Sequence, residues 1–261
     1  MKTRHWMLSL ASALATSLCM TACSPDASHE VVASNAPRHP VQQHETAAAA
    51  QRHGGSALFH WSERGSGLPP ADRAYLAQLS SRYHNIFADL DGRSLREVRA
   101  LGFPTAQEWL EARQLSDEEL KADADGGNLN AKIFYTDRRL MEIERLVASL
   151  EADSILDVFR ESPELRAQHQ QQVIDTHVSA AGLLKFHPTP FTAYLFGVSS
   201  AVTGGEEFPI PASMKLAADL GDTRAPALLR DYSRHVGEMD ANAVASSYSS
   251  MRAIAGSKGS P

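Results

Sequence analysis

The chain has 261 residues, of which 43% are hydrophobic, and a formal net charge of −6. This length allows a sizeable apolar core, and a mildly acidic chain without a Lys/Arg-rich run argues against nucleic acid and anionic lipid headgroups as partners. The only cysteines are Cys19 and Cys23. We therefore expect no disulfide, no metal site built from cysteine and no cofactor in the rest of the chain.

The first 22 residues are predicted to be a signal peptide. Lys2 and Arg4 precede an uncharged apolar run at residues 6–20, and small residues follow where a signal peptidase can cut. The alternative is a transmembrane anchor, which needs about 18 or more apolar residues, whereas this run has about 15. We expect residues 1–22 to be removed, which makes the remaining chain more acidic by two charges.

The sequence MTAC at residues 20–23 resembles the bacterial lipobox, in which Leu, a small residue and Ala or Gly precede a cysteine. Met20 stands in place of the usual Leu. The resemblance implies that Cys23 becomes the first mature residue and carries lipid. Each acyl methylene buried in a bilayer contributes about 0.8 kcal/mol, so several chains hold a domain at the membrane. Ser24, rather than Asp, follows the cysteine, which implies a lipoprotein of the cell envelope, in the outer membrane and facing the periplasm.

Residues 23–69 are predicted to be the lipidated cysteine followed by a flexible linker. The segment is rich in Ala, Ser, Gln, His, Pro and Gly and has few large apolar residues. Such a composition cannot bury enough surface to offset the entropy lost on ordering. Its histidines are irregularly spaced, which favours solvated linker residues over a metal site. The stretch ALFHW at residues 57–61 is a candidate for docking on the following domain.

From residue 70 to residue 261 we predict an all-α domain of antiparallel helical hairpins. Apolar residues recur there at three- and four-residue steps, without the two-residue alternation of strands. Ser116 with Glu119, and Ser162 with Pro163, are typical of helix starts. The predicted helices are residues 71–90, a short one from 94, 105–115, one opened by 116, 128–152, two within 153–186, 191–203, 212–220, 223–235 and 241–255.

The segment AADLGDTRAPALL, residues 217–229, partly repeats an earlier segment. The aligned pairs are Leu120 with Met214, Ala124 with Ala218, Gly127 with Gly221, Asn128 with Asp222, Ala131 with Ala225 and Asp137 with Asp231. An alanine methyl group lets two helices approach closely, a glycine adopts the left-handed conformation that ends a helix, and Asn or Asp caps the next helix. A short degenerate α-solenoid and an unrelated helical bundle both remain open.

A longer frame of about 32 residues is typical of helical hairpin repeats. It resembles the Sel-one-like branch of tetratricopeptide-type repeats, and the matching residues are Ala193, Gly197, Gly204, Ala217, Ala218, Gly221 and Ala225. The loop GGEEFPIP replaces the usual connector of that family, and residues 140–190 show no repeat. The resemblance implies that Ala193, Gly197, Ala217, Ala218, Gly221 and Ala225 are helix-packing positions. It also implies a scaffold or adaptor for a protein or peptide.

The sequence lacks the zinc-protease, nucleophile-elbow and phosphate-loop motifs. The segments DLDGRS and DADGGN resemble the start of an EF-hand loop, which requires Gly at its sixth and Glu at its twelfth position. Counted from Asp123 of DADGGN, those positions hold Asn128 and Phe134, so we interpret both segments as turns. ESPELRAQ resembles the catalytic Glu-Ser of periplasmic lytic transglycosylases at Glu161, although a helix start at Ser162 explains it equally. His84 and His177 are predicted to be core histidines, and Glu206 with Glu207 a solvated loop tip.

We therefore predict a protein that is not an enzyme: a lipoprotein facing the periplasm whose helical domain binds a protein or peptide partner as a scaffold or adaptor. The first alternative is an inhibitor or immunity lipoprotein that neutralises a cell-envelope effector. The second is a peptidoglycan-active enzyme that uses Glu161. In the two binding roles, the acidic chain favours a positively charged partner.

Overall fold

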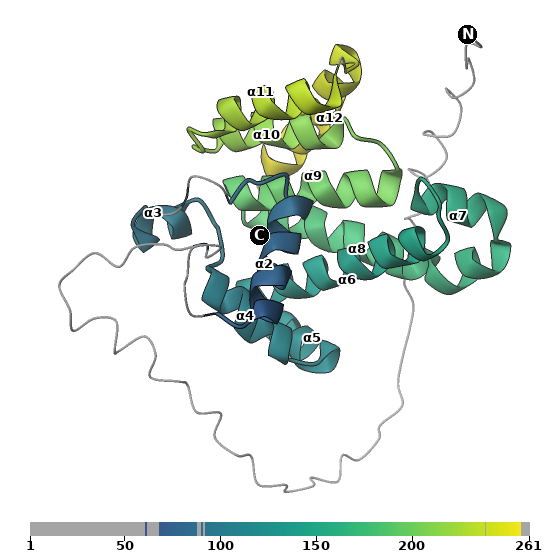
Figure 1. The fold of residues 1–261 in the computed structure, drawn as a ribbon. Coiled ribbons are helices and arrows are strands. Elements are labelled where there is room, and N and C mark those ends of the chain that lie inside the picture. The colour runs from purple at the N-terminus through teal and green to yellow at the C-terminus, as the bar shows by residue number, and fades with distance from the viewer. Residues whose placement is uncertain (1–60, 62–67, 88–89, 91, 238, 257–261) are drawn as a thin grey trace, which may run out of the picture. The chain divides into compact units, whose positions relative to one another are not determined.

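The computed structural model describes residue 61 and residues 68–87, 90, 92–237 and 239–256 (Figure 1). The chain divides into two units, 1–49 and 50–261, and all of these residues belong to the second. The described residues form eleven α-helices and no β-strand, which confirms the predicted all-α class. Cys23, the predicted leader and nearly all of the predicted linker lie outside the described residues.

In chain order the helices are α2 (Pro70–Arg82), α3 (Leu95–Ala100), α4 (Ala106–Gln114), α5 (Asp117–Asp125), α6 (Leu129–Ser149), α7 (Ile155–Glu161), α8 (Pro163–Phe186), α9 (Pro190–Gly204), α10 (Pro209–Asp219), α11 (Ala225–Val236) and α12 (Ala241–Gly256). Most of these bounds lie within three residues of the predicted ones. Not one of the described helices has both the length and the apolarity that crossing a bilayer requires.

Side-chain caps define where many of these helices begin. Ser94, Thr105 and Ser116 each open a helix with a capping box, which a Glu three residues later completes. At the predicted start of α5, the Glu119 carboxylate accepts from the Ser116 backbone N–H at 2.7 Å, and Ser116 Oγ accepts from the Glu119 N–H at 3.2 Å. Such a cap stabilises a helix by about 1 kcal/mol, so local sequence fixes these boundaries.

The first described helix is shorter than the sequence pattern predicted. α2 ends at Arg82, not near residue 90, because His84 and Asn85 have positive φ angles of 49° and 58° that no α-helix accommodates. The Asn85 N–H closes the turn on the Ser80 carbonyl at 2.8 Å. Four apolar residues at or beyond the turn are nevertheless buried: Tyr83, Ile86, Phe87 and Leu90. Tertiary packing, rather than a helical face, buries them.

Helix α9 lies at the centre of the helical packing. Residues 190–199 are all buried, and α9 packs against α6, α7, α8 and α10 (Figure 1). A helix that is buried on every side belongs to the interior of a fold rather than to its surface. Successive helices also pair as α5 with α6 and α10 with α11, and α12 packs against α8 and α10. These are the helical hairpins that the sequence predicted.

Aromatic rings join the start of the described chain to its middle. Trp61 stacks on Phe87 with ring centres 3.9 Å apart, Phe87 meets Phe103 edge-on at 5.7 Å, and Phe103 contacts Phe191 of α9 at 5.1 Å. Trp61 is only 6% exposed. It belongs to ALFHW, so at least this residue of the predicted linker packs on the helices; the other four lie outside the described residues.

A buried polar cluster ties the end of α2 to α6. The Tyr83 hydroxyl donates to the Asp137 carboxylate at 2.8 Å, and the Arg82 guanidinium lies 3.5 Å from Asp137 and 2.9 Å from Glu144. Burial raises the pKa of both Asp137 and Glu144, and the Arg82 charge opposes that rise. The cation therefore offsets part of the cost of burying these carboxylates between two segments that are distant in sequence.

A second buried cluster ties α9 to the turn before α11. The Tyr194 hydroxyl donates to Asp222 at 2.9 Å, and the Arg224 guanidinium donates to both oxygens of Asp222 at 3.0 and 2.8 Å. Arg224 Nη1 also donates to the Ile86 carbonyl at 2.7 Å, which reaches back to the turn after α2. Burial raises the pKa of Tyr194 well above its usual value, and Asp222 adds to the rise, so the phenol stays a neutral donor.

Candidate functional site

Three of the four alanines among the six predicted packing positions are fully buried, one on each of α9, α10 and α11. Ala193, Ala217 and Ala225 have no exposed surface, and Ala218 is half-buried. A methyl group at each buried position leaves room for the neighbouring helix, as bulkier side chains would not. These alanines therefore occupy positions at which helices approach one another closely.

The two glycines of the set act differently. At Gly197 an added Cβ would lie 2.5 Å from the Ser213 Cβ and 3.1 Å from the Pro209 carbonyl oxygen, so the missing side chain allows α10 to approach α9. At Gly221 there is open space, but the φ angle is +105°, which other residues rarely adopt. Gly197 thus serves packing and Gly221 serves the turn.

The two aligned segments share their turns but not their polar contacts. Gly127 and Gly221 both have positive φ angles, of 91° and 105°. Asn128 caps α6 by accepting from the Ala131 N–H at 3.1 Å, whereas Asp222 lies before the turn that starts α11 and binds Arg224 instead. Asp222 is not the N-cap residue of α11, which is Arg224, but its Oδ1 accepts from the Arg224 backbone N–H at 3.0 Å while the carboxylate also pairs with the buried Arg224 guanidinium.

The last aligned pair differs in environment. Asp137 is buried against Tyr83, whereas Asp231 is exposed and pairs with Arg234 at 2.9 Å. The pairing of these two aspartates in sequence therefore does not correspond to a shared structural role. In the later of the two aligned segments, the buried aspartate is Asp222.

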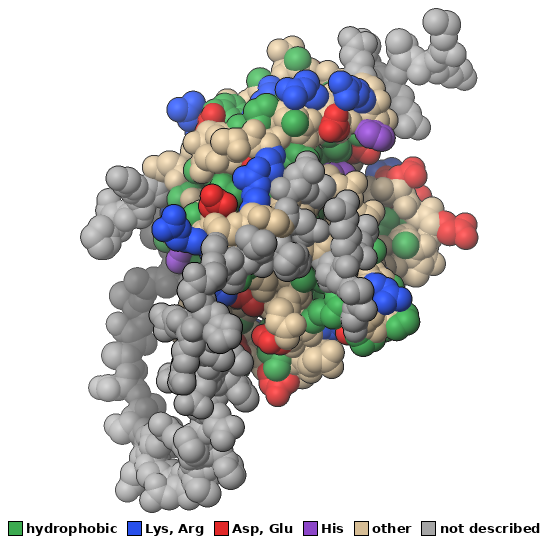
Figure 2. Space-filling model, turned by 60° about the vertical axis from the view of Figure 1, so that its left-hand side comes forward, with side chains coloured by type: hydrophobic (Ala, Val, Ile, Leu, Met, Phe, Trp, Pro, Cys, Tyr) green, Lys and Arg blue, Asp and Glu red, His purple; other side chains and the backbone are tan. Residues whose placement is uncertain are grey.

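A groove of about 330 Å³ opens between α10, α11 and α12 beside these positions. Its apolar lining consists of Met214, Ala218, Ala225, Pro226, Leu229 and Tyr248. The two charged residues that line it, Lys215 and Asp219, are both exposed. Figure 2 shows basic and apolar side chains side by side over the upper part of the molecule, the part that α10–α12 occupy in Figure 1. The groove thus combines apolar walls with charges of both signs.

Hydrogen bonds hold one wall of the groove in place. The Tyr248 hydroxyl of α12 donates to the Asp219 carboxylate at the end of α10, and Arg252 donates to the same hydroxyl at 3.3 Å. The bond to Asp219 raises the pKa of Tyr248, so the phenol remains protonated rather than serving as a base. These contacts fix the position of the Tyr248 side chain in the wall of the groove.

Sequence reasoning identified Ala218 and Ala225 but missed Leu229 and Tyr248. Leu229 lies in the amphipathic helix α11, where charged residues surround it in the sequence. Tyr248 lines the groove from α12, which carries no repeat-like motif. The apolar spacing within α11 was the only local signal for Leu229. No local signal places Tyr248 beside Asp219.

The remaining candidate residues lie away from the groove. Glu161 is the exposed last residue of α7, and Ser162 Oγ accepts from the Leu165 N–H at 3.3 Å as the cap of α8. The helix-start interpretation of ESPELRAQ is therefore confirmed at Ser162. Glu206 and Glu207 are exposed. Among the described residues no group of three or more His, Cys, Asp or Glu side chains is arranged to hold a metal ion.

The two candidate histidines are half-buried rather than fully enclosed. His84 meets the Tyr232 ring edge-on at 5.0 Å, and His177 Nδ1 lies 3.3 Å from Thr203 Oγ1. Burial lowers the pKa of both imidazoles. Both are therefore expected to be neutral at neutral pH, and each packs against an aromatic or hydroxyl neighbour of another helix.

We compared the chain with protein-family models, curated proteins and solved structures. None of them matches it.

Proposed function

We propose that this protein is a lipid-anchored protein of the cell envelope whose groove between α10, α11 and α12 binds a helical segment of a protein partner. The groove itself is the observation that carries the proposal. Its accessible apolar lining, with Pro226 exposed and Leu229 half-buried, matches the apolar face of an amphipathic helix. Lys215 and Asp219 stand four residues apart on α10, where they can pair with both charge signs on the polar flanks of such a helix.

Cross-linking at the groove tests the proposal. A photoreactive residue at position 229 of the full chain, in the cell envelope, is expected to give a discrete product with a partner protein. Ala218→Gln should abolish that product, because its longer side chain fills the half-buried position that lines the groove. The matched control is Ala227→Gln, since Ala227 lies on α11 but is exposed and does not line the groove.

The products also separate the two binding roles. One partner captured in a one-to-one product favours an inhibitor of a single effector, whereas several assembly proteins favour a scaffold. A product that persists unchanged in Ala218→Gln, or that is lost equally in Ala227→Gln, would contradict docking in the groove.

We expect the membrane anchor to depend on Cys23. Cys23→Ser removes the sulfur that would carry the lipid, so the chain should move from the membrane fraction to the soluble fraction of the envelope. Cys19→Ser changes the other cysteine, inside the predicted leader, and should leave the protein in membranes. Fractionation followed by immunoblotting gives the result. Membrane retention of Cys23→Ser would disprove the lipid anchor.

A further inference from the structure

A second cavity, of about 360 Å³, lies at the surface between α2, α4 and α6. Three arginines line it, Arg113, Arg138 and Arg145, and Tyr75 and Met141 are among the other lining residues. Arg138, Met141 and Arg145 are spaced three and four residues apart on α6, so they share one helix face. Arg113 comes from the last turn of α4. The cavity therefore gathers cations around a partly apolar floor.

Arg113 is held against α2. Its Nη1 donates to the Asp72 carboxylate at 2.9 Å, and its guanidinium carbon lies 5.1 Å from the centre of the Tyr75 ring. Burial raises the pKa of the Tyr75 phenol well above its usual value, and the Asp137 charge adds to the rise. Tyr75 thus offers the cavity a neutral hydroxyl and an aromatic face that already carries a cation.

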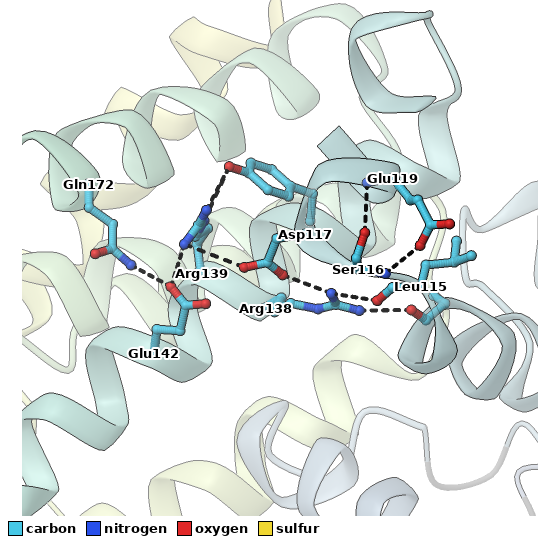
Figure 3. A network of polar contacts seen from close by, with 10 residues as sticks. Leu115, Ser116, Asp117, Glu119, Arg138, Arg139, Glu142 and Gln172 are labelled. Carbon is cyan, nitrogen blue, oxygen red and sulfur yellow. Dashed lines mark hydrogen bonds and ion pairs between the residues drawn. The ribbon is translucent and has the colours of Figure 1, made fainter. Parts of the chain in front are cut away.

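Arg138 is fixed more firmly by the junction of α4 and α5. It donates to the carbonyls of Leu115 and Ala112 at 2.9 and 2.8 Å and to the Asp117 carboxylate at 2.8 Å (Figure 3). Arg139, the next residue, pairs with Glu142 at 2.7 Å and also lies 3.8 Å from Asp117 (Figure 3). A guanidinium held by three acceptors is fixed in position, so Arg138 forms a rigid part of the cavity wall.

Arg145 differs from both. It is exposed, and its charge acts on the Glu144 carboxyl, opposing the rise in the pKa of that group, although no ion pair within 4 Å joins Arg145 to the described residues. The acid beside it in sequence, Glu144, is paired with Arg82 at 2.9 Å. The donors of Arg145 are therefore available at the cavity, whereas those of Arg113 and Arg138 are largely used.

The pairing of the lining arginines selects the kind of ligand. Arg113 and Arg138 each pair with a carboxylate, Asp72 and Asp117, whereas Arg145 keeps its guanidinium donors for a ligand. A single guanidinium with donors to spare matches one carboxylate better than a phosphate dianion. A guanidinium also presents parallel donors that fit a carboxylate in two-point contact. The volume is at the small end of ligand pockets, which suits the end of a peptide.

We propose that this cavity binds the C-terminal carboxylate of a peptide, with Arg145 pairing with the carboxylate and with Met141 and the Tyr75 ring contacting an apolar last side chain. The site uses α2, α4 and α6, whereas the groove proposed above uses α10, α11 and α12. The proposal therefore goes beyond the docking function and does not depend on it.

Ligand-observed NMR titration of the full chain in non-ionic detergent tests the site. The probes are N-acetyl-alanyl-leucine with a free carboxylate, the same dipeptide as its C-terminal amide, and inorganic phosphate. The free carboxylate is expected to bind at least about tenfold more tightly than the amide, since hydrogen bonds between charged groups are the stronger ones. Phosphate is expected to bind more weakly than the dipeptide carboxylate.

Arg145→Gln should weaken binding of the dipeptide carboxylate by about tenfold. Because Arg145 is exposed and forms no ion pair with the described residues, this change should leave the circular dichroism and thermal unfolding unaltered. Arg166→Gln is the matched control, an exposed arginine on α8 that does not line the cavity, and it should bind as the parent does. Equal binding of acid and amide, tighter binding of phosphate, full affinity in Arg145→Gln, or no binding of any probe would each overturn the proposal.

Discussion

Asp222→Asn is expected to lower the free energy of unfolding by about 3–5 kcal/mol, which is typical when one partner of a buried ion pair is removed. The side chains of Asp222 and Arg224 are 1% and 7% exposed, and Arg224 donates to both carboxylate oxygens. An asparagine of the same shape would remove the carboxylate charge that both Arg224 Nε and Nη2 contact. It would also place an amide where the Tyr194 hydroxyl and Arg224 both need an acceptor.

Urea denaturation followed by circular dichroism measures this loss. The matched control is Asp231→Asn, because Asp231 pairs with Arg234 at the surface, with the two side chains 61% and 74% exposed. Exposed ion pairs contribute little, so this variant should differ from the parent by no more than about 1 kcal/mol. A similar small change in Asp222→Asn would show that the buried pair is not what joins α9, α11 and the turn after α2.

Arg82→Met is expected to cost a similar amount, about 3–5 kcal/mol near neutral pH, by leaving Asp137 buried without its cation. Methionine keeps much of the volume of the side chain, so packing loss is small. Burial already raises the pKa of Asp137, while Arg82 and the Tyr83 hydrogen bond oppose the rise. Without Arg82 the pKa of the Asp137 carboxyl should rise further, and Glu144 should follow in the same direction.

The pH dependence gives this variant a distinct signature. A carboxyl with a higher pKa in the folded than in the unfolded state binds its proton more tightly when folded, so lowering the pH through the raised pKa stabilises the folded state. The deficit of Arg82→Met relative to the parent should therefore shrink as the pH falls from neutral toward the raised pKa of Asp137. Urea midpoints across that range measure it, and a constant deficit would contradict the assignment.

A surface arginine provides the control. Arg99 is 65% exposed and lies 3.6 Å from Glu108, so Arg99→Met should change the unfolding free energy by no more than about 0.5 kcal/mol. It should also show no comparable recovery at lower pH. A larger loss of stability in Arg82→Met than in Arg99→Met would show that the effect comes from the buried carboxylate and not from the removal of an arginine as such.

The two buried clusters also explain where the sequence pattern misled. The apolar residues at positions 75–87 fit one helical face, yet α2 stops at Arg82 and the chain turns. The turn places the Ile86 carbonyl where Arg224 Nη1 reaches it, at 2.7 Å. A periodic pattern reports which residues are buried but not whether the backbone continues straight, because burial on a turn and burial on a helix select the same residue types.

The groove and the cavity were beyond sequence reasoning for a related reason. Tyr248 meets Asp219 across two helices, and Arg113 joins Arg138 and Arg145 from a different helix. The net charge of −6 gave no sign of a cavity with three arginines, because an average over the surface conceals local imbalance. The apolar spacing predicts that Ala218 and Ala225 lie near a helix contact. It does not predict that Leu229 and Tyr248 line the same groove.

The sequence by itself determined the all-α class, the starts of α3, α5 and α8 at Ser94, Ser116 and Ser162, and the glycine turn at Gly221. These features depend on residues within a few positions of one another, where capping bonds and backbone conformation act locally. Only the tertiary structure decided that Asp222 also neutralises the buried Arg224 guanidinium, and which side chains line the groove and the cavity. Those features depend on contacts between segments far apart in the chain, whose meeting is set by the packing of the whole core.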